Sequence, residues 1–213
     1  MDQFENISIE TPDLILKKAH YEDWEPLYRN IWCHPESAKY MLWNVTTSEE
    51  DAKARIIRTI EFEKKEKYGL IVYLKSTMEA IGFACMREVE PEIYEETGIA
   101  VGPEYVRKGY GRQILTALCD EAKRQGVIEF RASYRKMNLA SKGMIEACGF
   151  EFDFESEEKV DPRNGEKYTV VNCKKKWTKG TGFVVHFIVQ YLLVLSLFQY
   201  QCAADRHPYT CRY

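Results

Sequence analysis

Glu104-Tyr-Val-Arg-Lys-Gly-Tyr-Gly-Arg-Gln113 joins two apolar segments of the chain and contains two glycines, Gly109 and Gly111. The segment before it, Ile99-Ala-Val-Gly-Pro103, is typical of the end of a strand. After it, apolar residues recur every three or four positions, as on one face of a helix. Glycine lets the backbone turn tightly and lets a ligand approach closely, because no Cβ intervenes. Since a helix start offers free N–H groups and a favourable dipole, the stretch predicts a binding site for a diphosphate.

Three basic side chains add positive charge to this site: Arg107, Lys108 and Arg112. A glycine at a helix start is often only a turn, so that simpler interpretation stays open on these residues alone. A nucleotide-binding enzyme is a further alternative, because a Gly-x-Gly turn also cradles ATP phosphates. The chain contains neither a Gly-Lys-Ser/Thr motif nor a kinase catalytic run, which argues against that class.

Residues 106–111 resemble the acyl-CoA pyrophosphate loop of the GNAT acetyltransferases, whose pattern is Gln or Arg, two residues, Gly, one residue, Gly or Ala. Val106 departs from the first position of that pattern. A second block, Asn138-Leu-Ala-Ser141 followed by Gly149-Phe150, is similar to the family's Asn-x-x-Ser/Ala helix that closes with Gly-Phe. The run Gly-Pro-Glu-Tyr105 is especially similar to the branch that resembles ribosomal-protein N-terminal acetyltransferases. The resemblance spans about residues 8 to 177.

This resemblance implies an N-acetyltransferase that uses acetyl-CoA as co-substrate and needs no metal. It implies transfer of the acetyl group to a primary amine of an unknown acceptor, either a protein N-terminus or a small molecule. The alternative is a non-catalytic module of the same fold that binds acyl-CoA. The residues expected to bind the cofactor are Ile99, Val101, Val106, Arg107, Lys108, Gly109, Tyr110, Gly111, Arg112 and Asn138.

Alternation and turn signals predict strands near residues 13–17, 68–74, 80–89, 93–101, 128–134, 150–155 and 168–173. Helices are expected over residues 24–32, after the capping box Thr47-Ser-Glu-Glu50, after Gly109 and after Asn138. Asp161-Pro-Arg-Asn-Gly165 predicts a hairpin turn. The order resembles that of the GNAT fold, an α/β fold of the α+β type. Its mostly antiparallel central sheet is flanked by helices and splayed between the fourth and fifth strands, where CoA binds.

Acetyl transfer needs a neutral amine held in line with the thioester carbonyl. A free α-amine has a pKa of about 8, whereas a lysine amine, near about 10.4, needs more help to lose its proton. Glu95 and Glu96 lie on the strand that leads to the loop, and family members carry a bulge there, which can switch the alternation. Glu-Thr-Gly98 resembles the Glu-x-Gly of related enzymes. We therefore predict Glu96 as the base and Glu95 in reserve, the alternative being solvated strand carboxylates.

The thiolate leaving group is stabilised by a proton donor. Many GNAT enzymes place a tyrosine seven residues after the helix asparagine, and here that position is Ile145. Ser141 is similar to the serine with which some members of this branch steady the thiolate, and it is the third predicted catalytic residue. The alternative for Ser141 is an ordinary serine at a helix start. Asn138 likewise has two interpretations, a ligand of the pantetheine arm or only a helix cap.

Aromatic side chains follow the first predicted helix and the loop after it. In GNAT folds this region walls the acceptor pocket, so the resemblance implies acceptor contacts from Trp32, Tyr40 and Trp43. The alternative for the helical aromatics is plain core packing.

The chain has 213 residues, of which 45% are hydrophobic and 30% charged, and this suits one globular domain. A net charge of −3 gives no general attraction to nucleic acid or to an anionic membrane. Expected partners are acetyl-CoA and the amine acceptor, with a monomer or a homodimer as the assembly. Seven cysteines without Cys-x-x-Cys spacing, and a start without an apolar signal segment, favour the cytoplasm. Four histidines show no metal-binding spacing.

Residues 1–177 are expected to form the acetyltransferase domain, and residues 178–213 an apolar tail outside it. The tail has one acidic residue, Asp205, and the run 183–198 is nearly all apolar. It is either a membrane anchor flanked by lysines, or a segment foreign to the enzyme, or a helix packed on the domain. We favour the foreign segment, because the resemblance ends where the composition changes. A membrane is a partner only if the tail is an anchor.

Overall fold

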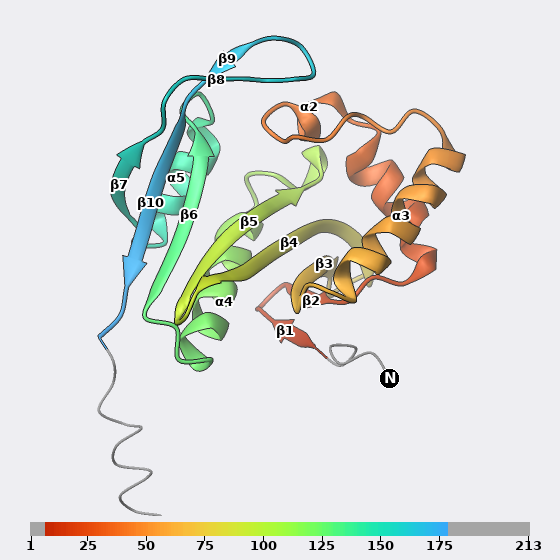
Figure 1. Cartoon of the computed structure of the whole chain (residues 1–213). Helices are drawn as coiled ribbons and strands as arrows, with labels where there is room; N and C mark the ends of the chain where they lie inside the picture. Colours follow the sequence, from red (N-terminus) through yellow and green to blue (C-terminus); the bar gives the residue numbers. More distant parts are fainter. Residues whose placement is uncertain (1–6, 179–213) are drawn as a thin grey trace, which may run out of the picture. The chain divides into compact units, whose positions relative to one another are not determined.

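The structure, a computed structural model, describes residues 7–178 (Figure 1). Its central sheet has the strand order β1-β2-β3-β4-β5-β6-β10-β7, and only the β5–β6 pair is parallel. The strands are β1 (Ser8–Glu10), β2 (Leu14–Lys17), β3 (Tyr68–Leu74), β4 (Glu79–Glu90), β5 (Ile93–Val101), β6 (Glu129–Arg135), β7 (Glu151–Glu155) and β10 (Val170–Lys176). A separate ribbon pairs β8 (Lys159–Val160) with β9 (Lys167–Tyr168).

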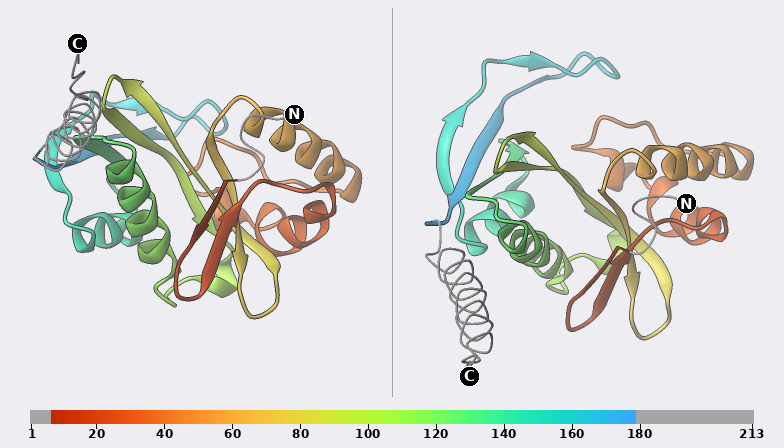
Figure 2. Two further views of the ribbon diagram at one scale, coloured as in Figure 1. Left: turned by 90° about the horizontal axis from the view of Figure 1, so that it is seen from below. Right: turned by 60° about the horizontal axis from the view of Figure 1, so that its bottom comes forward.

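Helices cover both faces of the sheet, as Figure 2 shows. They are α1 (Trp24–Leu27), α2 (Pro35–Ala38), α3 (Glu49–Glu63), α4 (Tyr110–Arg124) and α5 (Leu139–Ala147). Side chains alternate along β3, so that Leu70 and Val72 pack toward α4 while Ile71 and Tyr73 pack toward α1 and α3. The sheet therefore has a buried core on each face, the expected α+β arrangement with a mostly antiparallel sheet.

The fourth and fifth predicted strands correspond to β5 and β6, and they separate as predicted. The two strands pair only at their first residues, with Glu95 and Arg131 as the last pair. Beyond that point β5 remains paired to β4, and β6 to β10, so the strands diverge (Figure 1). The splay leaves one side of each strand without a neighbouring strand in the described residues.

Several local expectations needed correction. The N-cap of α3 is Ser48, whose Oγ accepts a hydrogen bond from the Asp51 N–H at 3.1 Å, so the predicted capping box lies one residue too early. The predicted helix over residues 24–32 begins as α1 and continues as a π-helical turn, Tyr28–Trp32. Strand β1 and the short helix α2 were not predicted.

Across residues 7–178, none of the helices is long and apolar enough to cross a membrane. The apolar run of the tail lies outside the described residues. Its three interpretations and the domain boundary at residue 177 therefore stay predictions.

Candidate active site

The start of α4 has the backbone geometry expected of an anion site. Gly109 is the N-cap with φ 82°, and Arg107 also has a positive φ of 60°, so the loop turns sharply into the helix. The Gln113 N–H donates to the Gly109 carbonyl at 3.1 Å. The N–H groups of the first turn, which includes Tyr110, thus point out of the helix end with no acceptor of their own in the helix. Such a helix start attracts phosphate.

The cationic side chains of this loop are exposed to solvent: Arg107, Lys108 and Arg112. Lys108 Nζ lies 5.3 Å from the centre of the Tyr105 ring. Val106 is 49% exposed, whereas Tyr110 packs against the core. Exposed cations around open backbone N–H groups fit a diphosphate, and the departure at Val106 does not remove any of these groups.

Gly111 serves a different purpose from Gly109. A Cβ at Gly111 would lie 2.8 Å from Met144 Sδ on α5, whereas a Cβ at Gly109 would meet nothing. The absence of a side chain at Gly111 therefore lets α4 approach α5 closely. Of the two glycines, Gly109 is the one whose missing Cβ opens toward solvent.

Strand β5 carries a bulge at the point where the sheet splays. Met86 of β4 pairs with Glu96, and Cys85 with Gly98, so Thr97 is the extra residue. Side chains of paired antiparallel residues point to the same face. Glu96 therefore shares the α4 face with buried Met86, as Ile99 and Val101 do by packing on that core. The bulge switches the alternation as expected.

Glu96 comes directly after the last β5–β6 pair, and its side chain is half-buried. Burial raises the pKa of this carboxyl to about 8, and the nearby Glu95 charge adds to the rise, while the Gly98 N–H opposes it by donating a hydrogen bond. Desolvation disfavours the charged form of an acid. A carboxyl with such a pKa exchanges protons near neutral pH, as a general base must.

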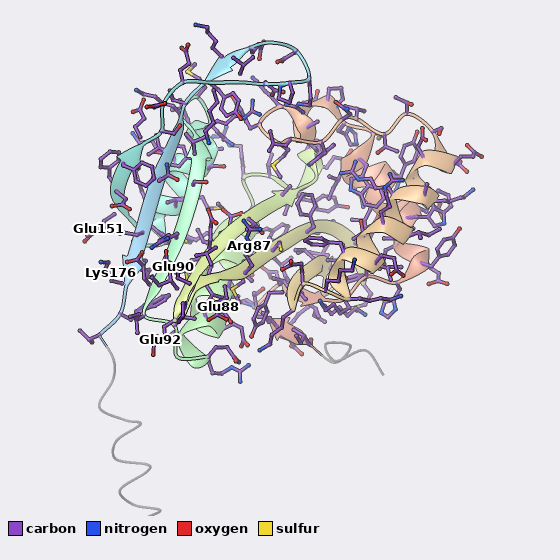
Figure 3. All side chains as sticks on the ribbon, in the orientation of Figure 1. Arg87, Glu88, Glu90, Glu92, Glu151 and Lys176 are labelled. Atoms are coloured by element: carbon purple, nitrogen blue, oxygen red, sulfur yellow. The ribbon has the colours of Figure 1, made fainter. Side chains whose placement is uncertain are left out.

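Glu95 lies in the opposite phase of the strand. It pairs with Arg87, whose guanidinium nitrogen is 3.9 Å from a Glu95 carboxylate oxygen. Figure 3 labels Arg87 on β4, beside β5. The two adjacent glutamates therefore sit in different surroundings: Glu95 faces a cation, and Glu96 is desolvated.

Asn138 and Ser141 lie together at the start of α5. Asn138 is the N-cap, and its Oδ1 accepts a hydrogen bond from the Ser141 N–H at 3.1 Å. Ser141 is half-buried in the first turn of the helix. Ile145 is 1% exposed and belongs to the core, so no acid stands at the position where related enzymes carry tyrosine.

The predicted acceptor residues divide between core and cleft. Trp32 is 2% exposed and packs in the core beneath α1 and α3, yet it also lines a hollow on that face. Trp43 lines the same hollow and is half-buried. Tyr40 instead lies at the opposite side of the splay, where its hydroxyl donates to the Met137 carbonyl at 3.3 Å.

A buried ion-pair cluster, missed from the sequence, ties the β8–β9 ribbon to the loop that carries Trp43. Asp161 is fully buried and accepts hydrogen bonds from Arg163 Nη2 at 2.7 Å and from Arg135 Nη2 at 2.8 Å. The Arg163 side chain holds the pKa of Asp161 well below its usual range. Arg163 Nη1 also donates to the carbonyls of Ala38 and Trp43, at 3.0 and 2.7 Å.

Arg55 of α3 was also not predicted from the sequence. It stands three residues after Ala52 and one before Ile56, at the edge of the inward stripe of its helix, which is a weak signal. Its guanidinium lies between the two tryptophans, 4.6 Å from the Trp32 ring centre and 4.4 Å from that of Trp43. Within the described part of the chain, no group of three side chains could hold a metal ion.

Comparisons with known proteins agree on one family. The model of the GNAT acetyltransferase domain matches residues 13–151. A bS18-alanine N-acetyltransferase of Escherichia coli is 40% identical over 52 residues, 24% of this chain and 35% of its own length. The chain therefore spans about a third of the curated relatives it matches.

Two solved structures show the same fold. A structure from Vibrio cholerae, described as that of a ribosomal-protein-serine acetyltransferase, superposes with a TM-score of 0.66 at 22% identity over 82% of this chain and 100% of its own. The microcin self-immunity acetyltransferase MccE, solved with acetyl-CoA and AMP, has a TM-score of 0.66 at 18% identity over 78% and 94%. With the family model covering about two thirds of the residues, the chain belongs to the GNAT acetyltransferase family.

Proposed function

We propose that this protein transfers the acetyl group of acetyl-CoA to a primary amine. The observation that carries the proposal is the position of Glu96, a carboxyl of raised pKa at the apex of the splay. The splay begins on the strand that leads to the open start of α4. A diphosphate site and a proton acceptor thus belong to one continuous segment, residues 93–112.

The cofactor would be held from both ends of this segment. The N–H groups at the start of α4, with Arg107, Lys108 and Arg112, bind the diphosphate. The unpaired edge of β5 at Ile99 and Val101 presents backbone groups to the pantetheine arm, and Asn138 adds a side-chain amide. The acetyl group would then lie near the bulge.

In the reaction, the amine nitrogen attacks the thioester carbonyl carbon. Its proton passes to the Glu96 carboxylate, directly or through a water, and the new C–N bond forms as the C–S bond breaks. Ser141 steadies the thiolate, which leaves as CoA after it takes up a proton. Glu95 is the reserve base. If neither glutamate proves to matter with an α-amine acceptor of low pKa, catalysis is positioning alone and needs no carboxylate base.

The acceptor is either a protein N-terminus or a small-molecule amine, and Trp32, Tyr40 and Trp43 are proposed to contact it. The names of the Escherichia coli and Vibrio relatives, both acetyltransferases of ribosomal proteins, support the first choice. As part of the same proposal, the protein works in the cytoplasm as a monomer or a homodimer. The five described cysteines are free thiols, as a reducing compartment requires.

Release of CoA in the presence of a panel of amines tests this function. The panel should contain N-terminal peptides, lysine peptides, polyamines and amino sugars, and a thiol reagent would report the released CoA. The proposal predicts amine-dependent release with at least one member. Binding of acetyl-CoA without release, across the whole panel, would instead identify a non-catalytic acyl-CoA-binding module.

A further inference from the structure

Arg55 is a cation without an acidic partner among the described residues, and its side chain is half-buried. Its Nη1 donates one hydrogen bond, to Thr46 Oγ1 at 3.0 Å. A guanidinium has five N–H donors, so most of them remain for another acceptor. Within residues 7–178, no carboxylate lies within ion-pair distance of Arg55.

The surroundings of Arg55 make this unpaired charge costly. The rings of Trp32 and Trp43 both lie against the guanidinium and remove water from it. Burial lowers the pKa of Arg55 to about 10, and the neighbouring Arg58 charge contributes to the fall. A desolvated charge is normally paired. Two aromatic faces offset part of this cost but supply no anion.

Arg55 lies where two hollows meet. The outer hollow, of about 500 Å³, is lined by Arg58, Thr46 and Asp51, and the inner one, of about 200 Å³, by Trp32, Phe83 and Cys85. Both are lined by Trp43, Arg55, Thr59 and Phe62. The outer volume is in the range of small-molecule sites.

The inner hollow adjoins the strand that carries the predicted base. Cys85 pairs with Gly98 across the bulge, and a Cβ at Gly98 would lie 3.5 Å from Phe83. Glu96 lies on the other face of the strand, so an acceptor that enters from the α3 face would place its amine at the splayed edge of the bulge and pass its proton to Glu96 through a water. The other end of that acceptor would then lie beside Arg55. Arg58, which is exposed, adds a second positive charge at the mouth.

Two acidic side chains also face these hollows, and each already has a partner. Asp51 Oδ2 accepts from the Ser48 hydroxyl at 2.9 Å. Glu63 accepts from the Ala19 N–H at 2.7 Å, and burial raises its pKa to about 7. Neither carboxylate neutralises Arg55.

We propose that Arg55, whose guanidinium lies against the rings of Trp32 and Trp43, binds an oxyanion of the acceptor, a carboxylate or a phosphate. The inference rests on the proposed acetyl transfer and names its substrate class, an amine that also carries an anionic group. Arg55 would position the acceptor so that its amine reaches the bulge. A planar guanidinium binds such oxyanions through two parallel hydrogen bonds.

Oxyanion binding is measured first, on the full chain saturated with CoA so that the helix-start loop is filled. Tryptophan fluorescence reports the titration of inorganic phosphate, and separately of glutarate, at constant ionic strength set with chloride. The expected result is a saturable change for at least one probe. Its affinity should fall at least about tenfold in Arg55→Met, which corresponds to about 1.4 kcal/mol. Arg55→Lys should retain an intermediate affinity, because lysine keeps the positive charge but lacks the two parallel N–H donors of the guanidinium.

Lys53→Met is the matched control. Lys53 is on the same helix and stacks 4.5 Å from the centre of the Trp24 ring, but it is paired with Glu49 at 3.5 Å. Its removal should leave the anion affinity unchanged. The absence of a saturable response in the parent protein would overturn the proposal, as would an equal loss in both methionine variants.

Turnover then separates this inference from the general function. Matched amines that differ only in the oxyanion are compared: phosphoethanolamine with ethanolamine, and Ser-Glu with Ser-Gln as dipeptides amidated at the C-terminus. The inference is supported if the parent protein prefers the anionic member of a pair and Arg55→Met loses this preference through a raised KM. The pair that shows the effect identifies the oxyanion that Arg55 binds. Acetylation that ignores the oxyanion refutes the inference and leaves the acetyltransferase intact. Anion binding without any acetylation refutes the acetyltransferase instead.

Discussion

Substituting Glu96 by glutamine tests the proposed base, and the expected pH dependence follows from its surroundings. With a pKa of about 8, the Glu96 carboxyl is protonated in most molecules at neutral pH. About one tenth is ionised at pH 7 and about nine tenths at pH 9. The value of kcat/KM should therefore rise roughly ninefold between these pH values and then level off.

The assay uses an acceptor amine of low basicity, such as trifluoroethylamine, so that the amine itself does not titrate over this range. Glu96→Gln keeps the shape and removes the proton acceptor, so kcat should fall by roughly 10²–10⁴-fold with nearly unchanged affinity for acetyl-CoA. Glu95→Gln is the matched control and should cost much less, because Glu95 faces Arg87. A larger loss in Glu95→Gln would reverse the assignment, and no loss in either would leave catalysis to positioning alone.

The same substitution should leave a signature in stability that does not depend on turnover. Because the folded-state pKa of Glu96 is raised, the native protein holds a proton that the unfolded chain has released. Stability attributable to this group therefore decreases as pH rises from about 4.5 to about 8. The melting temperature of Glu96→Gln, relative to the parent, should increase over that interval. A difference independent of pH would show that burial does not raise this pKa.

Three further predictions concern the framework. Gly111→Ala should destabilise the domain by about 1–3 kcal/mol in a urea titration, because the new Cβ meets Met144 Sδ, and Met144→Ala should recover part of that loss; no loss would contradict the close packing. Arg163→Ala should raise the acceptor KM with unchanged acetyl-CoA affinity, because it releases the loop that holds Trp43; a changed acetyl-CoA affinity would contradict a local role. Deleting residues 178–213 should leave a folded, CoA-binding domain, and aggregation on truncation would show that the tail packs on it.

Features set by local chemistry were predictable from the sequence. Gly109 takes a positive φ at the start of α4, where the sequence predicted a tight turn into a helix. Asn138 caps α5. The cap of α3 shows the limit of such patterns: Thr47 and Ser48 are each followed three residues later by an acid, and only the structure selects Ser48.

Features that depend on distant partners were not predictable. The phase of Glu96 follows from the register of β5 against β4, which places Thr97 in the bulge. The interaction of Arg163 with Trp43 spans 120 residues of sequence. Arg55 looked like one more charged residue at the edge of α3. Its contact with two tryptophan rings arises only when the loop before α3, which carries Trp43, meets the π-helical turn that ends at Trp32.

Calorimetry of CoA binding to a pair of Gly109 variants tests the central claim most directly. Gly109→Asp and Gly109→Asn have nearly the same shape, tolerate a positive φ and suit an N-cap, and the added Cβ has no neighbour within 4 Å. They differ in one negative charge at the proposed diphosphate site. We predict that Gly109→Asp binds CoA at least about tenfold more weakly than Gly109→Asn, a difference of about 1.4 kcal/mol. Equal affinities of the two folded variants would contradict binding of CoA at this helix start.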